Sequence, residues 1–196
     1  MPVTDLRQRL EDALSVTGDV SSDFDLNPDV SAPLRRLTPA GVLIGISART
    51  ETVVLTKRSA RLKHHPGQIA FPGGRQDPTD PTPVAAALRE AQEEIGLPPD
   101  IVEVVGSLPR HQTVTNYHVT PVVALIHEAF DHRPEAGEVS EVFEVPLSHL
   151  LDLRNYRVEG RLWQGRKRFY YTVPFGPYYI WGATGRMLRG LAERMA

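Results

Sequence analysis

The sequence predicts an α/β fold in which helices pack against a mixed β-sheet. Seven short apolar or alternating runs have the length and residue types of strands, and other segments carry apolar residues at helical spacing. The chain has 196 residues, which suits one ordinary globular domain with an additional segment at one end. We therefore expect a single sheet-based domain.

The first region, residues 1–37, is predicted to be a helix followed by a surface arm. Leu6, Leu10 and Leu14 recur at helical spacing, so residues 4–16 are expected to form an amphipathic helix. Residues 18–39 are rich in Asp, Ser and Pro with little periodicity, which is typical of an arm laid over the surface of a domain. The main domain is predicted to span residues 38–196.

The strands of the main domain are predicted next, and together they are expected to form one mixed sheet. The runs at 41–48 and 52–58 are joined by a short turn and indicate a hairpin or close neighbours. Further strands are expected at 103–108, 118–126, 141–147, 157–163 and 168–173. Pro121 predicts an edge strand or a bulge, because proline cannot donate a hydrogen bond to a neighbouring strand.

Two more helices are predicted, one between the strands and one at the end of the chain. The first spans residues 83–95. The second spans residues 182–194, where Met187, Leu188 and Leu191 share a face. Aromatic residues between positions 169 and 181 are expected to seal the last strands against this final helix.

Composition excludes several classes of protein. Lys plus Arg number 22 and Asp plus Glu number 24, with no basic cluster, which argues against a nucleic-acid partner. The absence of Cys excludes disulfide scaffolds, thiolate zinc sites and cysteine nucleophiles. Apolar runs are far shorter than the ~18 residues of a membrane span, and the N-terminus carries acids that secretory and mitochondrial signals lack. We expect a cytoplasmic protein without a membrane partner, either a monomer or a homodimer.

The most informative segment is the predicted helix at 83–95. Thr82 suits its N-cap, Pro83 its first turn and Gly96 a left-handed stop, so the sequence marks both ends. Its predicted buried stripe consists of Val84, Ala87, Leu88, Ala91 and Ile95.

Three carboxylates, those of Glu90, Glu93 and Glu94, are predicted to project from one side of this helix. Like charges at this spacing cost roughly 0.2–0.5 kcal/mol per pair, and Arg89 supplies one compensating charge. Oxygen ligands without His or Cys favour Mg²⁺ or Mn²⁺. A solvated acidic face is the alternative, but the Gly-Gly pair at 73–74 allows the backbone to approach a ligand closely, which favours a metal site.

The segment from Gly74 to Leu97 resembles the Nudix box, whose pattern is Gly, five residues, Glu, seven residues, then Arg-Glu-apolar-x-Glu-Glu-x-Gly-apolar. The run that begins at Arg89 matches the second half in full. In the first half, Asp80 stands in place of Glu, and eight residues rather than seven separate it from Arg89. The departure leaves the role of Asp80 open and does not affect the glutamates.

This resemblance implies a Nudix-type α/β/α sandwich with a catalytic loop-helix-loop. It also implies hydrolysis of a nucleoside diphosphate linked to another group, by attack of water at phosphorus. Glu90 and Glu94 would hold a divalent ion, and Glu93 would share ligation or act through water. Arg89 would orient one of the carboxylates.

The general base varies in position within this family and often falls on a downstream acid. Glu138 and Glu141 are the nearest downstream acids that could return to the helix. We choose Glu138, and the alternative for both residues is a surface acid without a catalytic role.

The segment immediately upstream of the box, from Val54 to Gly74, resembles the signature of the coenzyme A pyrophosphatase branch of Nudix hydrolases. The shared positions run from a Lys-Arg-Ser triplet through His-x-Gly-Gln to Phe-Pro-Gly-Gly. They are Lys57, Arg58, Ser59, Leu62, His65, Gly67, Gln68, Phe71, Pro72, Gly73 and Gly74. The extra residue in the box is also similar to this branch, and segments at 115–123, 138–147 and 179–191 extend the resemblance over about 40–191.

The branch resemblance implies hydrolysis of coenzyme A or its thioesters to 3′,5′-ADP and 4′-phosphopantetheine or its acyl form. The substrate contacts that it implies are Arg58, Ser59, His65, Gly67, Gln68, Phe71, Gly73 and Gly74. Arg58 is chosen for phosphate because a guanidinium offers paired donors. His65 suits a hydrogen bond in the loop or one phosphate contact better than a metal. Phe71 is either a core residue or stacks on a base, and Asn116 is expected to adopt a left-handed turn.

Two alternatives remain open. A Nudix pyrophosphatase for ADP-ribose, a dinucleotide or a (d)NTP belongs to the same class. A non-catalytic module that binds nucleotides or a partner protein belongs to another class. The intact glutamate trio argues against the module, because a binding protein could relieve the repulsion by losing one acid.

Overall fold

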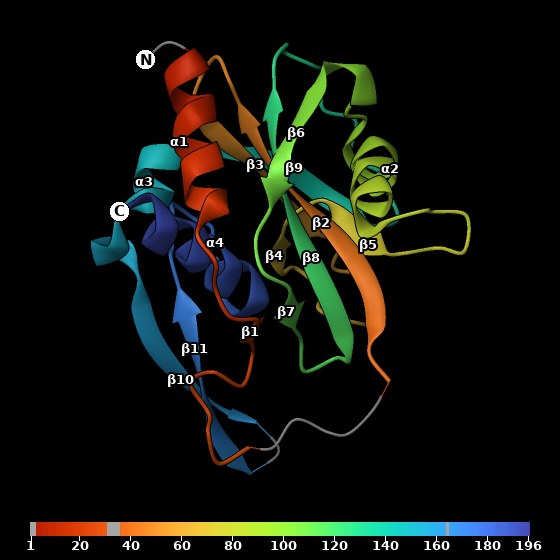
Figure 1. Cartoon of the computed structure of the whole chain (residues 1–196). Coiled ribbons are helices and arrows are strands. Elements are labelled where there is room, and N and C mark those ends of the chain that lie inside the picture. Colours follow the sequence, from red (N-terminus) through yellow and green to blue (C-terminus); the bar gives the residue numbers. More distant parts are fainter. Residues whose placement is uncertain (1–2, 31–35, 164) are drawn as a thin grey trace.

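A computed structural model of the chain describes residues 3–30, 36–163 and 165–196 and has the predicted α/β architecture (Figure 1). The helices are α1 (Val3–Ser15), α2 (Pro83–Ile95), α3 (Leu147–Leu151) and α4 (Gly182–Met195), with 3-10 turns at Pro99–Ile101 and Leu153–Asn155. The strands are β1 (Ser21–Ser22), β2 (Thr38–Ser47), β3 (Thr52–Arg58), β4 (Ile69–Ala70), β5 (Gly73–Arg75), β6 (Val102–Ser107), β7 (His111–Gln112), β8 (Tyr117–Ile126), β9 (Val139–Pro146), β10 (Arg157–Trp163) and β11 (Arg166–Thr172). Among these described helices, none has the length and apolar character needed to cross a membrane.

A nine-stranded mixed sheet forms the centre of the described structure. Its axis is the parallel pair β2–β8, in register from Thr38 opposite Tyr117 to Ser47 opposite Ile126. Strands β3 and β5 pair antiparallel with β2, β6 and β7 with β8, and β4 and β9 with β3, whereas β1 runs parallel to β7. The predicted contact between the runs at 41–48 and 52–58 is thus confirmed.

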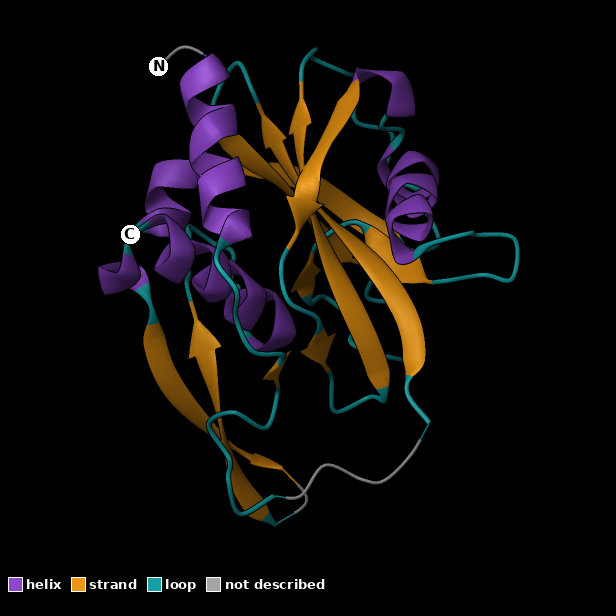
Figure 2. Cartoon of the chain, in the orientation of Figure 1, coloured by secondary structure: helices purple, strands orange, loops and turns teal. Residues whose placement is uncertain are grey.

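Alternating side chains divide the core into two layers, one on each face of the sheet. Leu43 and Val122 belong to the cluster that packs against α2. Their chain neighbours Ile44 and Val123 belong to the cluster with α1, α3 and α4. Since successive side chains of a strand point to opposite faces, one apolar strand supplies both layers. Figure 2 shows α2 on one side of the sheet and the other helices on the opposite side, which is the predicted α/β/α sandwich.

The N-terminal segment contributes to the same core as the main domain. Leu6 and Leu10 of α1 are 1% and 0% exposed and join the cluster that contains α4. After α1, the chain adds β1 to the sheet beside β7. The arm is therefore attached both by packing and by backbone pairing.

Two predictions about strands are wrong. The strands predicted at 157–163 and 168–173 do not join the central sheet but form a separate antiparallel hairpin, β10–β11. Pro121 lies neither on an edge strand nor at a bulge, since β8 lies inside the sheet. It stands where β8 changes partner, because β6 ends opposite Val122 and β7 begins opposite Val119. The missing N–H group of Pro121 falls at this junction, so no ladder hydrogen bond is lost.

Close packing of α2 on β2 requires Gly41. A Cβ atom at this position would lie 1.9 Å from the carbonyl oxygen of Pro83, in the first turn of α2. Backbone cannot rotate aside as a side chain can, so the whole helix would have to move. We expect Gly41→Ala to lower the free energy of unfolding by about 2–3 kcal/mol, measured by urea denaturation.

Gly45→Ala in the same strand is the matched control. A Cβ atom at Gly45 would meet Cδ1 of Ile126 at 3.0 Å, the end of a side chain that can adjust. We expect a loss below about 1 kcal/mol for this variant. Equal losses for the two variants would contradict the role given to Gly41.

Candidate active site

The two ends of α2 are formed as the sequence predicts. The Thr82 hydroxyl accepts a hydrogen bond from the Ala85 N–H group at 3.1 Å, and Pro83 occupies the first turn. Gly96 has a φ of 73°, and its N–H group donates to the Gln92 carbonyl at 3.0 Å. These caps fix where the helix starts and stops, and hence which way its glutamates point.

The three glutamates of α2 have different environments, although the sequence predicted one common side. Glu94 is 5% exposed, and its Oε2 accepts a hydrogen bond from the Gly73 N–H group at 3.0 Å. Glu90 is partly buried with its carboxylate against Gly74 of β5. Glu93 faces solvent, with a side chain that is 59% exposed. Glu90 and Glu94 therefore lie together at β5, and Glu93 flanks them.

The Gly-Gly pair of β5 makes this contact possible. Gly73 has a φ of 149°, and a Cβ atom there would lie 2.4 Å from the carbonyl oxygen of Gly41 on β2. At Gly74, a Cβ atom would lie 2.5 Å from Oε1 of Glu90. Any side chain at either position would push β5 away from β2 or from the carboxylates. The pair thus brings a backbone N–H group and two carboxylates to one place.

Arg89 connects the loop before α2 to two of the glutamates. Its Nε and Nη2 atoms donate to the carboxylate of Asp80 at 3.0–3.3 Å. Its Nη2 also donates to Glu90 at 3.0 Å, and its Nη1 donates to Glu93 at 2.8 Å. The hydrogen bonds from Arg89 and from the Asp77 N–H group hold the pKa of Asp80 below its usual value. Asp80, whose role the sequence left open, therefore anchors Arg89.

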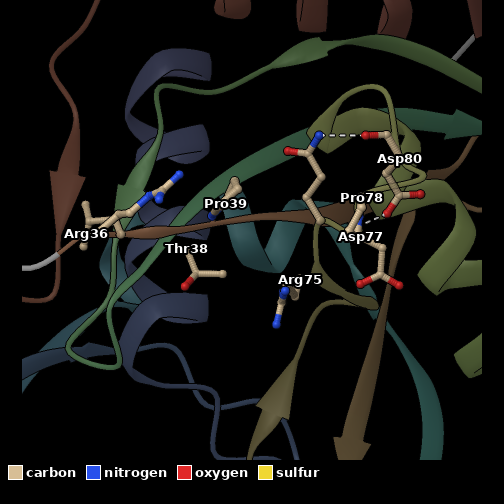
Figure 3. Close-up of a pocket in the computed structure, with 9 residues that line it drawn as sticks. Arg36, Thr38, Pro39, Arg75, Asp77, Pro78 and Asp80 are labelled. Atoms are coloured by element: carbon tan, nitrogen blue, oxygen red, sulfur yellow. Dashed lines mark hydrogen bonds between the residues drawn. The ribbon is translucent and has the colours of Figure 1, made fainter.

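A cavity of about 520 Å³ lies beside the loop that carries Asp80 (Figure 3). Its lining includes Arg36, Arg75 and Asp77, and none of the three glutamates of α2. Figure 3 shows the loop closed by hydrogen bonds from the Gln76 side chain and the Asp77 N–H group to Asp80. Asp80 thus lines this cavity and also accepts the hydrogen bonds from Arg89.

The segment upstream of β5 folds into a loop between β3 and β4. The Arg58 N–H group donates to the Gln68 carbonyl at 2.9 Å, and the Gly67 N–H group donates to the Arg58 carbonyl at 3.1 Å. His65 and Gly67 both have left-handed backbone, with φ of 53° and 71°. Partial burial, followed by the charge of Arg58, lowers the pKa of His65. His65 is therefore neutral at pH 7 and suited to a hydrogen bond.

Arg58 lies between this loop and the buried glutamate. Its positive charge acts on both Glu94 and His65. Its Nε atom is buried and has no hydrogen-bond partner in the described part of the chain. Buried donors are normally paired, so this unpaired guanidinium N–H group marks Arg58 as a side chain whose hydrogen bonding is incomplete within the described residues.

The two downstream acids, Glu138 and Glu141, differ in the groups on which they act. The charge of Glu138 acts on both Glu90 and Glu94, and its carbonyl accepts a hydrogen bond from the Ser59 N–H group at 2.7 Å. The carboxylate of Glu141 instead accepts a hydrogen bond from the Tyr178 hydroxyl at 2.5 Å. Glu138 is therefore the downstream acid whose charge acts on the paired glutamates, whereas Glu141 is engaged by Tyr178.

Two residues expected to contact substrate are buried. Phe71 is 3% exposed within the main core cluster, so its alternative role in stacking on a base is wrong. Ser59 is 6% exposed, and its hydroxyl accepts a hydrogen bond from the Arg61 N–H group at 3.3 Å, which shapes the loop. The left-handed turn expected at Asn116 is confirmed by its φ of 66°.

Burial controls the protonation of the paired glutamates. It raises the pKa of Glu94 to about 7, against the hydrogen bond from Gly73, and Glu90 adds to the shift. It also raises the pKa of Glu90, against the effect of Arg89. Two desolvated carboxylates side by side are stabilised by a cation. No group of three or more His, Cys, Asp or Glu residues at metal-ligand spacing occurs among the described residues. Water, backbone or substrate oxygens would therefore complete the shell of a hard cation, which accepts them readily.

Comparison with known proteins connects this arrangement to one family. Residues 37–172 match the NUDIX domain family. The uncharacterized Nudix hydrolase NudL of Escherichia coli (strain K12 / DH10B) is 42% identical over 168 residues, which cover 85% of this chain and 88% of that protein. NudL of Citrobacter koseri is 40% identical over 185 residues, 93% of this chain and 96% of that protein.

Solved structures show a similar fold. The MutT protein of Methanosarcina mazei has a TM-score of 0.51 at 18% identity, covering 83% of this chain and 95% of that chain. The NUDIX domain of Shewanella oneidensis NrtR, crystallised with ADP ribose, has a TM-score of 0.52 at 15% identity, covering 83% of this chain and 91% of that chain. At these identities the likeness concerns the fold alone.

The raised pKa of Glu94 makes the stability of the metal-free chain depend on pH. A carboxyl group with a pKa of about 7 in the folded chain, against 4.5 as its ordinary value, prefers to fold protonated. Its contribution is complete below pH 4.5 and is lost as the pH rises through 7. We expect urea unfolding in a chelator to show a loss of up to about 3 kcal/mol over this range. Glu94→Gln should remove most of that loss.

Glu93→Gln is the matched control for this measurement. The Glu93 side chain is 59% exposed, so its removal should leave the pH dependence of unfolding unchanged. A Glu94→Gln chain that still loses stability as steeply as the parent between these pH values would contradict the assignment.

Proposed function

We propose that this chain, which belongs to the Nudix hydrolase family, hydrolyses the diphosphate of coenzyme A or its thioesters. The chain is a Nudix pyrophosphatase, and the identity of its substrate is our inference. The products would be 3′,5′-ADP and 4′-phosphopantetheine or its acyl form. A phosphorylated cofactor as substrate agrees with the cytoplasmic location that the sequence predicts.

The observation that supports this substrate most strongly is the position of Arg58. The segment that resembles the coenzyme A pyrophosphatase signature could have lain anywhere on the surface. Instead, Arg58 acts electrostatically on Glu94, and its buried Nε atom has no partner in the described structure. The charge of Arg58 also acts on His65, which belongs to the same loop region. A guanidinium beside two carboxylates is suited to a substrate that brings both a cation and phosphate oxygens.

We further propose Mg²⁺ or Mn²⁺ as the cofactor, held by Glu90 and Glu94, with Glu93 sharing ligation or acting through water. Nudix hydrolases generally use divalent ions of this kind. The residues present fit such an ion, since the buried carboxylate of Glu94 and the partly buried carboxylate of Glu90 are hard oxygen donors that need compensating charge. When bound, the ion would neutralise the diphosphate and lower the pKa of a nearby water.

The chain's own residues would perform the remaining steps. Arg89, held by Asp80, keeps the carboxylate of Glu90 in position. Glu138 would accept a proton from the attacking water, whose oxygen forms a bond to phosphorus as the bridging P–O bond breaks. Arg58 would bind a phosphate, and Gly73 and Gly74 would keep the backbone close to the diphosphate, with the loop of Gly67 and Gln68 beside them.

The substrate proposal predicts a preference that kinetics can measure. Coenzyme A, ADP-ribose and a dNTP would be supplied separately with Mg²⁺, and kcat/KM compared. We expect coenzyme A or an acyl form to exceed the others by at least about tenfold, which is roughly 1.4 kcal/mol of transition-state binding. A higher kcat/KM for ADP-ribose or the dNTP would contradict the assignment of coenzyme A and identify another substrate of a Nudix pyrophosphatase.

The role of Glu94 predicts a loss of turnover without a loss of fold. Glu94→Gln keeps the shape of the side chain and removes one negative ligand, so we expect kcat to fall at least ~10²-fold. Binding of Mn²⁺ should weaken in parallel, measured by calorimetry. Gln92→Glu, which adds an acid on the exposed face of the same helix, is the control and should keep kcat. Full turnover by Glu94→Gln would favour a different catalytic arrangement, and absence of turnover by the parent chain would favour the binding module.

A further inference from the structure

The β10–β11 hairpin has one covered edge and one open edge. Figure 1 shows β10 as the outermost strand, with β11 between it and the rest of the molecule. The Asn27 side chain covers the inner edge, since it hydrogen bonds to the N–H and carbonyl groups of Phe169 at 2.8 and 2.9 Å. No strand among the described residues pairs with the outer edge of β10. The backbone groups of that edge are therefore open to another strand.

Of the features that usually protect an edge strand, β10 has charged side chains, at Arg157, Glu159 and Arg161, and lacks the others. Edge strands are commonly kept short, bulged, interrupted by proline or charged. β10 has seven residues without proline, and its ladder with β11 runs without a bulge. Val158, Leu162 and Trp163 are 53%, 73% and 44% exposed. An edge that is regular, long and partly apolar favours pairing.

One charged side chain of β10, that of Arg161, also lacks an oppositely charged partner among the described residues. Arg161 faces Arg168 directly across the hairpin, and like charges in such a pair are unfavourable. No ion pair of Arg161 is found in the described part of the chain. The one acid of β10, Glu159, lies two residues away and accepts a hydrogen bond from the Tyr179 hydroxyl at 2.7 Å. An acid from outside the hairpin would therefore stabilise the charge of Arg161.

We propose that β10 pairs antiparallel with β10 of a second copy of the chain, about a two-fold axis at Gly160. In this register Glu159 of each copy lies opposite Arg161 of the other. The outer positions match as well, since Arg157 meets Trp163 and Val158 meets Leu162 of the other copy. These are opposite-charge, cation–π and apolar pairs, which are the combinations that stabilise adjacent strands. The dimer would contain a four-stranded sheet.

The alternation of side chains is consistent with this register. Residues 157, 159, 161 and 163 lie on one face of the hairpin, and residues 158 and 162 lie on the other. Each proposed pair joins residues of the same face, as antiparallel pairing requires. The strand begins at the body of the molecule and ends at the tip of the hairpin, so a two-fold axis at its centre places the two bodies at opposite ends of the new sheet.

A second copy fits this edge better than an acidic partner of another kind. An acidic strand would attract Arg161 but repel Glu159 and leave Val158 and Leu162 exposed. Self-pairing satisfies all four residues, because a two-fold axis inverts the order of the strand. The edge of seven residues is small compared with stable dimer interfaces, so we expect reversible association that depends on concentration.

Charge reversal tests the register directly. Sedimentation of the full chain over a range of concentrations should show a species of twice the 21.8 kDa chain mass. Arg161→Glu places acids opposite each other at two positions, and Glu159→Arg places arginines opposite each other. Each variant alone should weaken the dimer at least ~10-fold. Mixing the two variants should restore a dimer, because every facing pair is again of opposite charge.

Controls separate this pairing from a loss of fold. Arg49→Glu changes the same charge at an exposed turn outside the hairpin and should leave the dimer intact. Leu162→Ser alters a side chain that is already 73% exposed, so it should keep the unfolding temperature and the hydrolysis rate of the parent while it weakens the dimer. A parent chain that stays monomeric at every concentration, or two charge variants that do not associate when mixed, would overturn the proposal.

Discussion

The site depends on one contact, the hydrogen bond from the Gly73 N–H group to the buried carboxylate of Glu94. It forms because Gly41 has no Cβ atom to meet the first turn of α2, and because Gly73 and Gly74 let β5 lie close to β2 and to the carboxylate of Glu90. A carboxylate with a single neutral donor in a desolvated position is poorly stabilised as an anion. The fold therefore holds a carboxylate whose negative charge is not balanced. A bound cation is the simplest group that balances it.

The charges around this contact have separate functions. Arg89 engages Asp80, Glu90 and Glu93, and so it determines the shape of the acidic face. Arg58 stands on the other side, near Glu94, with a donor that no described group uses. Arg89 thus holds carboxylates in position, whereas Arg58 has a guanidinium N–H group without a partner among the described residues. Arginine identity alone does not distinguish these functions, whereas hydrogen-bond partners do.

Local patterns predicted much of the fold because their causes are local. The caps of α2 use backbone groups within a few residues, so Thr82 and Gly96 marked both ends correctly. Long strands such as β2 and β8 carry enough β-branched and apolar residues to be recognised. The strands β4 and β5, with two and three residues, have no such pattern and exist only because β3 and β2 provide partners. Pro121 was misread for the same reason, since its tolerance depends on where β6 ends and β7 begins.

Residue types and their spacing identify the kinds of groups at the site: a capped helix with three glutamates, a glycine pair before it and a basic segment upstream. Which of these groups come into contact depends on the packing of distant segments. It buried Glu94 and exposed Glu93, gave Asp80 a partner, moved Phe71 into the core and left the edge of β10 open. The physical reason is that residue types and short-range periodicity are properties of the chain. Burial and pairing instead depend on which distant segments share a surface, and a linear pattern does not contain that information.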